Sequence, residues 1–346
     1  MSTNLGLDVF GESDSAWNEA LSRLDGRTFC HQAGWARVIE RSFGHESIGL
    51  AARDASGAVV GLLPLVRMKS RIFGHNLISM PYLNYGGPVG SPEACKALAT
   101  AGAELATTSG AGLMELRDRR PTDLGLPVSL GKVTVVLPLP ANAETLFNDV
   151  LKAKVRSQVR RPMKEGMTSS FGLSKLGEFY DVFCENMRDL GTPVLPRRFF
   201  ETIADVFPDQ MIVGLVYSGA KAVAGGVGFL FEGEFELTWA SSLRAYAREA
   251  PNMLLYWSLM EEVIRRGGTA FNFGRCTPDS GTHRFKRQWG GVDVQLHWSR
   301  WSPSTADSSP VKDRPIFQLA TRVWRRLPLP IANALGPLVS PALPSW

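Results

Sequence analysis

The sequence predicts an α+β fold made of two similar domains in tandem. In each half of the chain, a β-hairpin signal is followed by a strand, a helix and two further strands. Both hairpins turn at a glycine–alanine segment, first at Gly57–Val59 and again at Gly219–Val223. A chain of 346 residues is long enough for two domains. We therefore expect two mixed sheets flanked by helices, followed by a C-terminal amphipathic helix.

The first domain is expected over residues 1–142. Runs of β-branched and aliphatic side chains indicate its strands, and the Asp54–Gly57 turn joins the first two. Ser91 as N-cap and Pro92 after it mark the start of a helix. The predicted elements are strands Ser47–Arg53, Ala58–Lys69 and Leu77–Leu83, helix Pro92–Gly110, and strands Gly112–Asp118 and Lys132–Leu139.

The second domain is expected over residues 143–300. It begins with one helix over Ala143–Arg161, which Pro162 should kink or end. A later helix closes on two arginines and two glycines, as helix C-termini often do. The predicted elements after the connecting helix are strands Met211–Gly219, Ala222–Gly233 and Glu234–Ser242, helix Pro251–Gly268, and strands Ala270–Cys276 and Val292–Ser299.

Residues 301–346 predict a linker and an amphipathic tail. Ser302–Pro310 has a linker composition, and a helix is expected within 314–330. One side of this helix carries Ile316, Phe317, Ala320, Val323, Trp324 and Leu327, with Arg322, Arg325 and Arg326 on its flanks. Two interpretations stay open: the helix lies on an anionic membrane surface, or it packs across the two domains.

The composition is that of a mildly basic globular protein. Apolar residues make up 44% of the chain and the net charge is +5, which permits phosphate-bearing partners. The four cysteines lie far apart and form no C-x-x-C pair, so we expect neither a metal site nor a disulfide framework. No signal peptide and no long apolar run is recognised, so we expect a cytoplasmic protein, and a monomer.

A basic row marks the connecting helix. Lys152, Arg156, Arg160 and Lys164 recur every four residues, and no acidic residue lies between the first and the last. An unbroken helix would place them on one side. The row is either a solvated helix face or a site for phosphates on a nucleotide-linked substrate or an RNA.

Two loops offer further candidates. Tyr82, Asn84 and Tyr85 precede a Gly-Gly-Pro turn and form either pocket walls or an ordinary packed turn. Arg244 lies in the loop before the Pro251–Gly268 helix. The start of that helix could bind an anion, although a routine crossover has the same sequence features.

The segment from Phe271 to Gly291 gathers cations beside aromatic residues. Lys286 as a cation would stabilise an oxyanion, and Phe285 would exclude water from it. His283 is a candidate general base for which no partner carboxylate is evident. Arg275, at the end of the preceding strand, is a candidate pocket residue. The alternative for the whole segment is a basic surface turn.

Three motifs resemble the FemAB-like peptidyltransferases. "KAKVRSQVRRPMKEG" is similar to their basic helix segment, "GTHRFKRQWGG" to their Y-x-F-K-x-x-F/W-G-G segment, and "MPYLNYGGPV" to their Y-G-G-P turn. The longer stretch "FNFGRCTPDSGTHRFKRQWGG" also resembles the FemAB-related proteins associated with exosortase and exopolysaccharide gene clusters. The resemblance covers most of residues 43–299.

The resemblance implies two GNAT-type acyltransferase domains and transfer of an acyl or aminoacyl group onto an amine of a cell-envelope precursor, in peptidoglycan or an exopolysaccharide-related pathway. It implies no covalent enzyme intermediate and no bound cofactor. The expected partners are a nucleotide- or lipid-linked precursor and, as donor, aminoacyl-tRNA or acyl-CoA. The implied catalytic residues are His283, Phe285 and Lys286, and the implied substrate-binding residues are Tyr82, Asn84, Tyr85, Lys152, Arg156, Arg160, Arg244 and Arg275.

Two alternatives remain. The chain lacks the long coiled-coil arm of some relatives, and Pro162 interrupts the basic segment, so an acyl-CoA-dependent N-acyltransferase is one alternative. The other is a non-catalytic protein that binds a precursor for an export or exopolysaccharide system. A peripheral position at the inner face of the membrane, through residues 314–330, is compatible with each.

Overall fold

The computed structural model describes residues 5–70, 74–303 and 315–343. The chain forms two compact units. Within the described ranges, unit 1 contains residues 5–133, 294–303 and 342–343, and unit 2 contains residues 134–293 and 315–341. Each unit therefore draws on separate parts of the chain, whereas the sequence predicts continuous domains.

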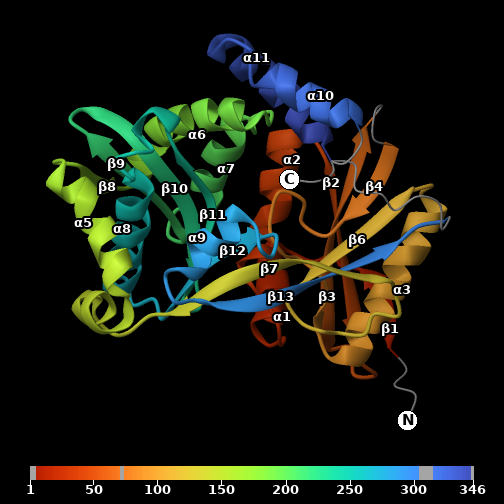
Figure 1. The fold of residues 1–346 in the computed structure, drawn as a ribbon. Helices are drawn as coiled ribbons and strands as arrows, with labels where there is room; N and C mark the ends of the chain where they lie inside the picture. Colours follow the sequence, from red (N-terminus) through yellow and green to blue (C-terminus); the bar gives the residue numbers. More distant parts are fainter. Residues whose placement is uncertain (1–4, 71–73, 304–314, 344–346) are drawn as a thin grey trace. The chain divides into compact units, whose positions relative to one another are not determined.

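Unit 1 is a sheet with helices packed on it (Figure 1). Its strand order is β1-β2-β3-β4-β6-β13-β7, and β4 and β6 are parallel. Helix α3 covers the sheet with small residues such as Ala94 and Ala99, which pack among leucines of β3. The elements are β1 (Gly6–Val9), α1 (Asp14–Ser22), α2 (Gly34–Phe43), β2 (Glu46–Arg53), β3 (Val59–Ser70), β4 (Gly74–Ile78), β5 (Val89–Gly90, paired with β3), α3 (Pro92–Thr108), β6 (Leu113–Asp118), the first part of β7 (Val128–Pro138) and most of β13 (Val292–Trp301).

Local sequence signals explain the confirmed elements of unit 1. The Asp54 carboxylate accepts hydrogen bonds from the backbone N–H groups of Ser56 and Ala58, which fixes the β2–β3 turn. The Ser91 hydroxyl accepts from the N–H of Ala94 and caps α3.

One strand prediction in unit 1 is wrong in extent. The strand predicted over Leu77–Leu83 ends at Ile78. Met80 and Tyr82, on either side of Pro81, have positive φ angles of 45° and 71°, which a strand does not permit. The polypeptide therefore leaves the sheet in an irregular turn at this point.

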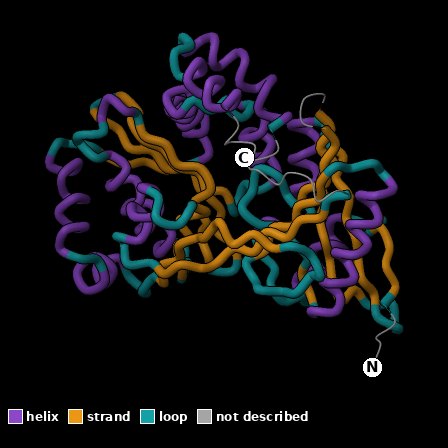
Figure 2. Tube along the Cα trace, turned by 45° about the vertical axis from the view of Figure 1, so that its right-hand side comes forward, coloured by secondary structure: helices purple, strands orange, loops and turns teal. Residues whose placement is uncertain are grey.

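Unit 2 is a mixed sheet with helices on both faces (Figure 2). Its strand order is β7-β12-β11-β10-β9-β8, and β11 runs parallel to β12. At Gly225 an added Cβ would contact Phe179 of α6, and at Gly226 it would contact Leu259 of α8. Neighbouring strand residues face opposite sides, so α6 and α8 cover opposite faces of β10.

The elements of unit 2, besides the last part of β7, are α4 (Ala143–Thr145), a π-helical turn (Leu146–Val150), α5 (Ala153–Lys164), β8 (Thr168–Phe171), α6 (Leu176–Leu190), α7 (Arg197–Val206), β9 (Met211–Ser218), β10 (Lys221–Phe231), β11 (Glu234–Ser242), α8 (Pro251–Arg265), β12 (Ala270–Cys276), α9 (Gly281–Arg287), α10 (Pro315–Trp324) and α11 (Leu329–Val339). The sequence predicts none of β8, α6, α7, α9 and α11.

The connecting helix differs from its prediction in two ways. It is broken at Leu151, whose ψ of 132° is extended, and α5 starts after Lys152 as a separate helix. Pro162 neither ends nor interrupts α5, which continues to Lys164 with the proline buried. Because Pro162 lies in the last turn, its missing N–H removes only one hydrogen bond near the end of the helix.

The predicted tail helix corresponds to α10 and is followed by α11. The side chains of Ile316 and Phe317 and nearly all of the predicted linker lie outside the described residues. The α11 helix contacts α6 of the same unit. Within the described ranges, no helix has both the length and the apolar character needed to cross a membrane.

Candidate active site

The short helix α9 presents the predicted catalytic residues. The Ser280 hydroxyl caps it by accepting a hydrogen bond from the N–H of His283 at 3.1 Å. Asp279 enters the helix with a φ of 59°, in the left-handed region that aspartate tolerates better than most residues. The loop segment Pro278–Ser280, between β12 and α9, therefore determines where α9 starts.

His283 holds this helix through both ring nitrogens. The backbone N–H of Asp279 donates to Nδ1 at 3.0 Å, so Nδ1 carries the lone pair. The proton of the neutral ring is then on Nε2, which lies 3.0 Å from both carboxylate oxygens of Asp293. This carboxylate is the partner that the sequence did not reveal. The arrangement favours a positioning role, and the general-base role of His283 stays a prediction.

Lys286 points from α9 to the backbone of β12. Its Nζ donates to the carbonyl oxygens of Gly274 at 2.7 Å and Arg275 at 3.0 Å, and the residue is only 5% exposed. Gly274 has a φ of 71°, which turns the strand at this point, and its N–H donates to the side chain of Asn272. A bend in β12 therefore brings two carbonyl groups to one ammonium group.

Burial makes Lys286 unusually acidic for a lysine. Desolvation lowers its pKa from 10.5 to about 8, while the neighbouring Cys276 and Glu236 side chains oppose this shift. An ammonium group has three N–H bonds, and the two carbonyls accept two of them. The third can donate to an oxygen of a substrate. Lys286 is thus a desolvated cation with one donor left for an oxyanion.

Phe285 belongs to an aromatic cluster, of which the sequence predicted only Phe285 as a site residue. Its ring contacts Tyr256 of α8 edge-on, with centroids 5.0 Å apart. Tyr256 also stacks on Phe273 and on Trp289. Burial raises the pKa of the Tyr256 phenol, so it stays neutral in the physiological range. The cluster joins α9 to α8 and β12 through ring contacts.

Strands β11 and β12 pair over only part of their length. Their parallel register joins Glu234–Glu236 to Ala270–Asn272, whereas β11 continues to Ser242 and β12 to Cys276. Lys286 contacts the part of β12 that lies beyond this register. A bulge in β11 also leaves Thr238 with no residue opposite it on β10.

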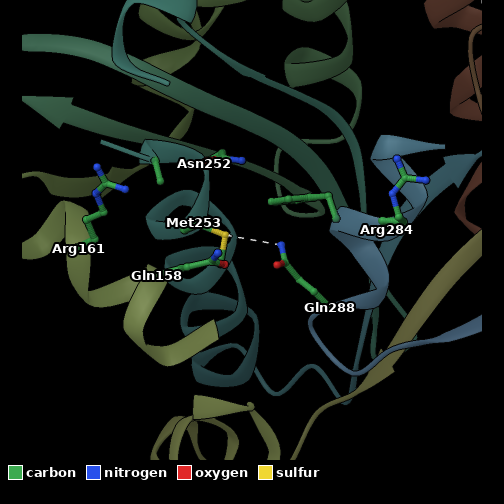
Figure 3. Close-up of a pocket in the computed structure, with 8 residues that line it drawn as sticks. Gln158, Arg161, Asn252, Met253, Arg284 and Gln288 are labelled. Carbon is green, nitrogen blue, oxygen red and sulfur yellow. Dashed lines mark hydrogen bonds between the residues drawn. The ribbon is translucent and has the colours of Figure 1, made fainter. Parts of the chain in front are cut away.

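An open pocket of about 410 Å³ lies at the start of α8 (Figure 3). Its lining comes from α5, α8 and α9: Gln158, Arg161, Ala250, Asn252, Met253, Arg284, Phe285 and Gln288. Of the described residues that line it, two are arginines and none carries a carboxylate. The Gln158 Oε1 is buried without a hydrogen-bond partner, and Gln288 Nε2 donates to the Met253 sulfur at 3.8 Å.

The pocket and Lys286 lie on different sides of α9. Arg284 and Gln288, four residues apart, share the pocket side with Phe285, whereas Lys286 is directed to β12. The pocket is suited to an anion because Arg161 and Arg284 line it and the positive end of the α8 dipole, with the Asn252 N–H, borders it. The Arg284 guanidinium also donates to the Asp279 carbonyl at 2.6 Å, and the Met253 N–H donates to the Ala250 carbonyl at 2.9 Å. The sequence predicted an anion site at the loop before α8. It could not predict that α5 also lines this pocket, because the fold alone brings α5 beside the loop.

The predicted basic row of α5 is largely engaged in local contacts. The Arg156 guanidinium donates to the backbone carbonyls of Leu151 at 2.6 Å and Asn148 at 2.9 Å. The Arg160 guanidinium lies 5.0 Å from the centre of the Phe147 ring. Lys152 is the exposed N-cap residue of α5. These contacts favour a structural role, so phosphate binding by the row stays a prediction.

The predicted loop residues have different settings. Arg244 is exposed in a turn after β11, and Arg275 is half-buried on β12, where its carbonyl accepts from Lys286. Neither lines the pocket.

The tyrosine-rich turn belongs to unit 1. Tyr82, Asn84 and Tyr85 are 4%, 7% and 1% exposed, and the hydroxyl of Tyr82 lies 3.1 Å from His45 Nε2. The guanidinium of Arg119 stacks on Tyr85. Burial to this degree favours the packed-turn alternative, and substrate binding by these residues stays a prediction.

Among the residues of the described ranges, no group of three histidine, cysteine, aspartate or glutamate side chains is placed to hold a metal ion.

Comparisons with known proteins support this description. Residues 153–287 match the family described as "Acetyltransferase (GNAT) domain". No curated protein matches the chain. The segment that matches contains α5, the β11–β12 pair, α9 and all the pocket residues except Gln288, and so contains Phe285 and Lys286.

Solved structures extend the likeness to both units. FemX is 14% identical with a TM-score of 0.64, covering 91% of this chain and 100% of that one. L-PGS from Bacillus licheniformis is 15% identical with a TM-score of 0.57, covering 91% and 98%. A tandem GNAT protein from the clavulanic acid biosynthesis pathway is 12% identical with a TM-score of 0.55, covering 88% and 100%.

At these identities the structural comparisons establish the fold. The predicted tandem GNAT-like α+β architecture is confirmed, and so is the predicted enzyme class. The chain has a tandem GNAT-like fold, and the match of residues 153–287 to the acetyltransferase (GNAT) domain supports an acyltransferase.

Proposed function

We propose that this acyltransferase forms an amide by moving an acyl or aminoacyl group onto an amine of a cell-envelope precursor. The observation that carries the proposal is the buried Lys286, whose ammonium group retains one donor beside the bend in β12. The resemblance of the Phe285–Lys286 segment to FemAB-like proteins supports the choice of reaction.

The reaction follows from the charge of Lys286. The acceptor amine attacks the donor carbonyl carbon, a C–N bond forms, and negative charge develops on the carbonyl oxygen. The third N–H of Lys286 donates to this oxygen, and the low-polarity surroundings strengthen the interaction. The bond to the leaving oxygen or sulfur then breaks, and the proton lost by the amine neutralises the leaving group.

The donor is proposed to place its phosphates in the pocket at the start of α8. Arg161 and Arg284 provide the charge there, and the acyl group would extend along the parts of β11 and β12 beyond their shared register. Acyl-CoA and aminoacyl-tRNA both combine an activated acyl group with phosphates. The match to the acetyltransferase (GNAT) family favours acyl-CoA as one candidate, and the FemAB-like motifs favour aminoacyl-tRNA as the other.

The acceptor is proposed to be a nucleotide- or lipid-linked precursor. This rests on the FemAB-like motifs and, for a link to exopolysaccharide export, on the similarity of Phe271–Gly291 to exosortase-associated relatives. A cytoplasmic reaction is proposed because such precursors carry nucleotide or lipid diphosphates before export.

Donor binding tests the proposal most simply. Calorimetry of the full chain with acetyl-CoA, charged tRNA and uncharged tRNA should show binding of one donor class. An Arg161→Gln/Arg284→Gln variant should weaken that binding by on the order of tenfold or more. Lys154→Gln is the matched control, because Lys154 is exposed on α5 and does not line the pocket.

The outcomes separate the candidates. Binding of acetyl-CoA alone selects the acyl-CoA reaction, and preference for charged over uncharged tRNA, weakened by salt, selects aminoacyl transfer. Binding of neither class, together with binding of a diphosphate-linked precursor, would contradict the transferase proposal and favour a precursor-binding protein.

A further inference from the structure

The last two helices expose an unusual amount of apolar surface. Six of the fourteen exposed large apolar residues in the described part of the chain lie on α10 and α11. They are Leu319, Val323, Ile331, Leu335, Leu338 and Val339. Leu338 is 76% exposed and Leu319 is 59% exposed. A clustered set of this kind marks an interaction surface more often than scattered single residues do.

The α11 helix has one face packed and the opposite face open. Ala332, Gly336 and Ser340 are buried, and Gly336 lies so close to Val194 that an added Cβ would come within 2.8 Å of its backbone. Leu335 and Leu338 lie on the other side. The small residues of α11 therefore pack against the rest of unit 2, and its large aliphatic residues face outward. A surface helix normally has the opposite arrangement, with its large apolar residues facing the core.

The α10 helix is fixed in the same way. The guanidinium of Arg325 donates to the Leu190 carbonyl at the end of α6, and Thr321 packs against Gly191. The guanidinium of Arg188 donates to the carbonyl of Leu327, between the two helices. These bonds hold the inner side of α10 against α6 and determine which side faces outward.

The outward side of α10 combines aliphatic and cationic side chains. Leu319 and Val323 are exposed one turn apart, and Arg322 and Arg326 are exposed beside them. Residues 315–343 contain three arginines and no aspartate, glutamate or lysine. A surface that is both aliphatic and purely cationic matches a bilayer with anionic headgroups, because the bilayer offers hydrocarbon and negative charge together.

We propose that the open face of α10 and α11, formed by Leu319, Arg322, Val323, Arg326, Ile331, Leu335 and Leu338, docks the protein reversibly on an anionic phospholipid bilayer. The helices lie in the plane of the headgroups and do not span the membrane. The proposal is independent of the acyl-transfer reaction, because no residue of this face lines the pocket at α8 or contacts Lys286.

Vesicle flotation of the full chain tests the proposal. Vesicles of phosphatidylglycerol and phosphatidylcholine in equal amounts should carry the protein, and vesicles of phosphatidylcholine alone should carry much less. Leu335→Ser/Leu338→Ser should reduce partition to the anionic vesicles on the order of tenfold or more, because two aliphatic side chains that would enter the bilayer are lost. Arg322→Gln/Arg326→Gln should reduce it and remove most of its salt dependence.

The matched control is Leu130→Ser, because Leu130 is 53% exposed on β7 of unit 1, outside the tail. It should partition like the wild type. Equal flotation of the wild type and both tail variants, or no preference for anionic vesicles, would overturn the proposal. So would a concentration-dependent dimer without lipid that Leu335→Ser/Leu338→Ser abolishes, which would assign the face to a second copy of the chain. Circular dichroism of each variant checks that it is folded.

Discussion

The ammonium group of Lys286 combines burial with incomplete hydrogen bonding. Among the described residues, two acceptors, the carbonyls of Gly274 and Arg275, reach this ammonium group, and the residue is 5% exposed. Desolvation lowers its pKa from 10.5 to about 8, so the cation destabilises the folded state, as is common for groups poised for chemistry.

The pH dependence of stability should reveal this lysine. The folded pKa lies below the unfolded value, so the unfolded state binds more protons between pH 8 and 10.5. Stability of the wild type should therefore rise with pH across this window, relative to a Lys286→Met variant, by up to about 3 kcal/mol. Urea unfolding of both proteins at several pH values measures the difference. A difference that stays constant, or falls, as the pH rises would show that Lys286 is not desolvated.

The His283 side chain gives a second test at the residue scale. Both ring nitrogens are engaged, one by the Asp279 N–H and one by Asp293. We expect His283→Gln to lower kcat by less than about tenfold, whereas loss of a general base costs roughly 10²–10⁴-fold. Steady-state kinetics decides, with thermal melting as the control for folding. A loss in the larger range in a folded variant would restore His283 as the base.

At the scale of elements, glycine positions decide how closely the strands and helices of unit 2 approach. At Gly228 on β10 an added Cβ would lie 2.3 Å from the Glu236 carbonyl oxygen and 2.4 Å from the Phe235 ring. This is next to the bulge that leaves Thr238 unopposed on β11. The backbone cannot give way here without changing the register of the two strands.

We therefore expect Gly228→Ala to destabilise the fold by about 1–3 kcal/mol. Gly281→Ala is the matched control, because nothing lies within 4 Å of its added Cβ and it stands in the first turn of α9. Chemical denaturation of both variants measures the contrast. Equal stabilities would contradict the tight approach of β10 to β11.

Element prediction from sequence succeeded where the signal was local. The Asp54 turn, the Ser91 cap and the alternating strands are determined by neighbouring residues, and the structure contains them. The prediction failed at Leu151 and Pro162, where the path of the chain depends on packing against α8 and on how near the helix end the proline lies. The helices α6 and α7 were not predicted either. Their aromatic residues are buried by contacts with several other elements, which the local sequence does not reveal.

The candidate site was only partly predictable for the same reason. The cluster Phe285–Lys286 was visible as cations beside aromatic residues, but the partners of Lys286 are backbone carbonyls, which no sequence pattern identifies. Tyr256 and Arg161 come from α8 and α5, and only the fold places them near α9. Asp293 is separated from β12 in the sequence by α9 and a turn. Its hydrogen bond to His283 therefore forms only when α9 packs next to the start of β13.

At the scale of the whole molecule, one chain joins two GNAT-like units and a tail with an exposed aliphatic and cationic face. The central claim is that Lys286 stabilises the developing oxyanion during acyl transfer in unit 2. The most direct test measures single-turnover transfer and donor binding with the wild type and Lys286→Met, using the donor that calorimetry selects. We predict unchanged donor affinity, a loss of transfer on the order of 10²-fold or more, and a wild-type rate that falls as the pH rises through about 8. Full transfer by the folded Lys286→Met variant would contradict the account.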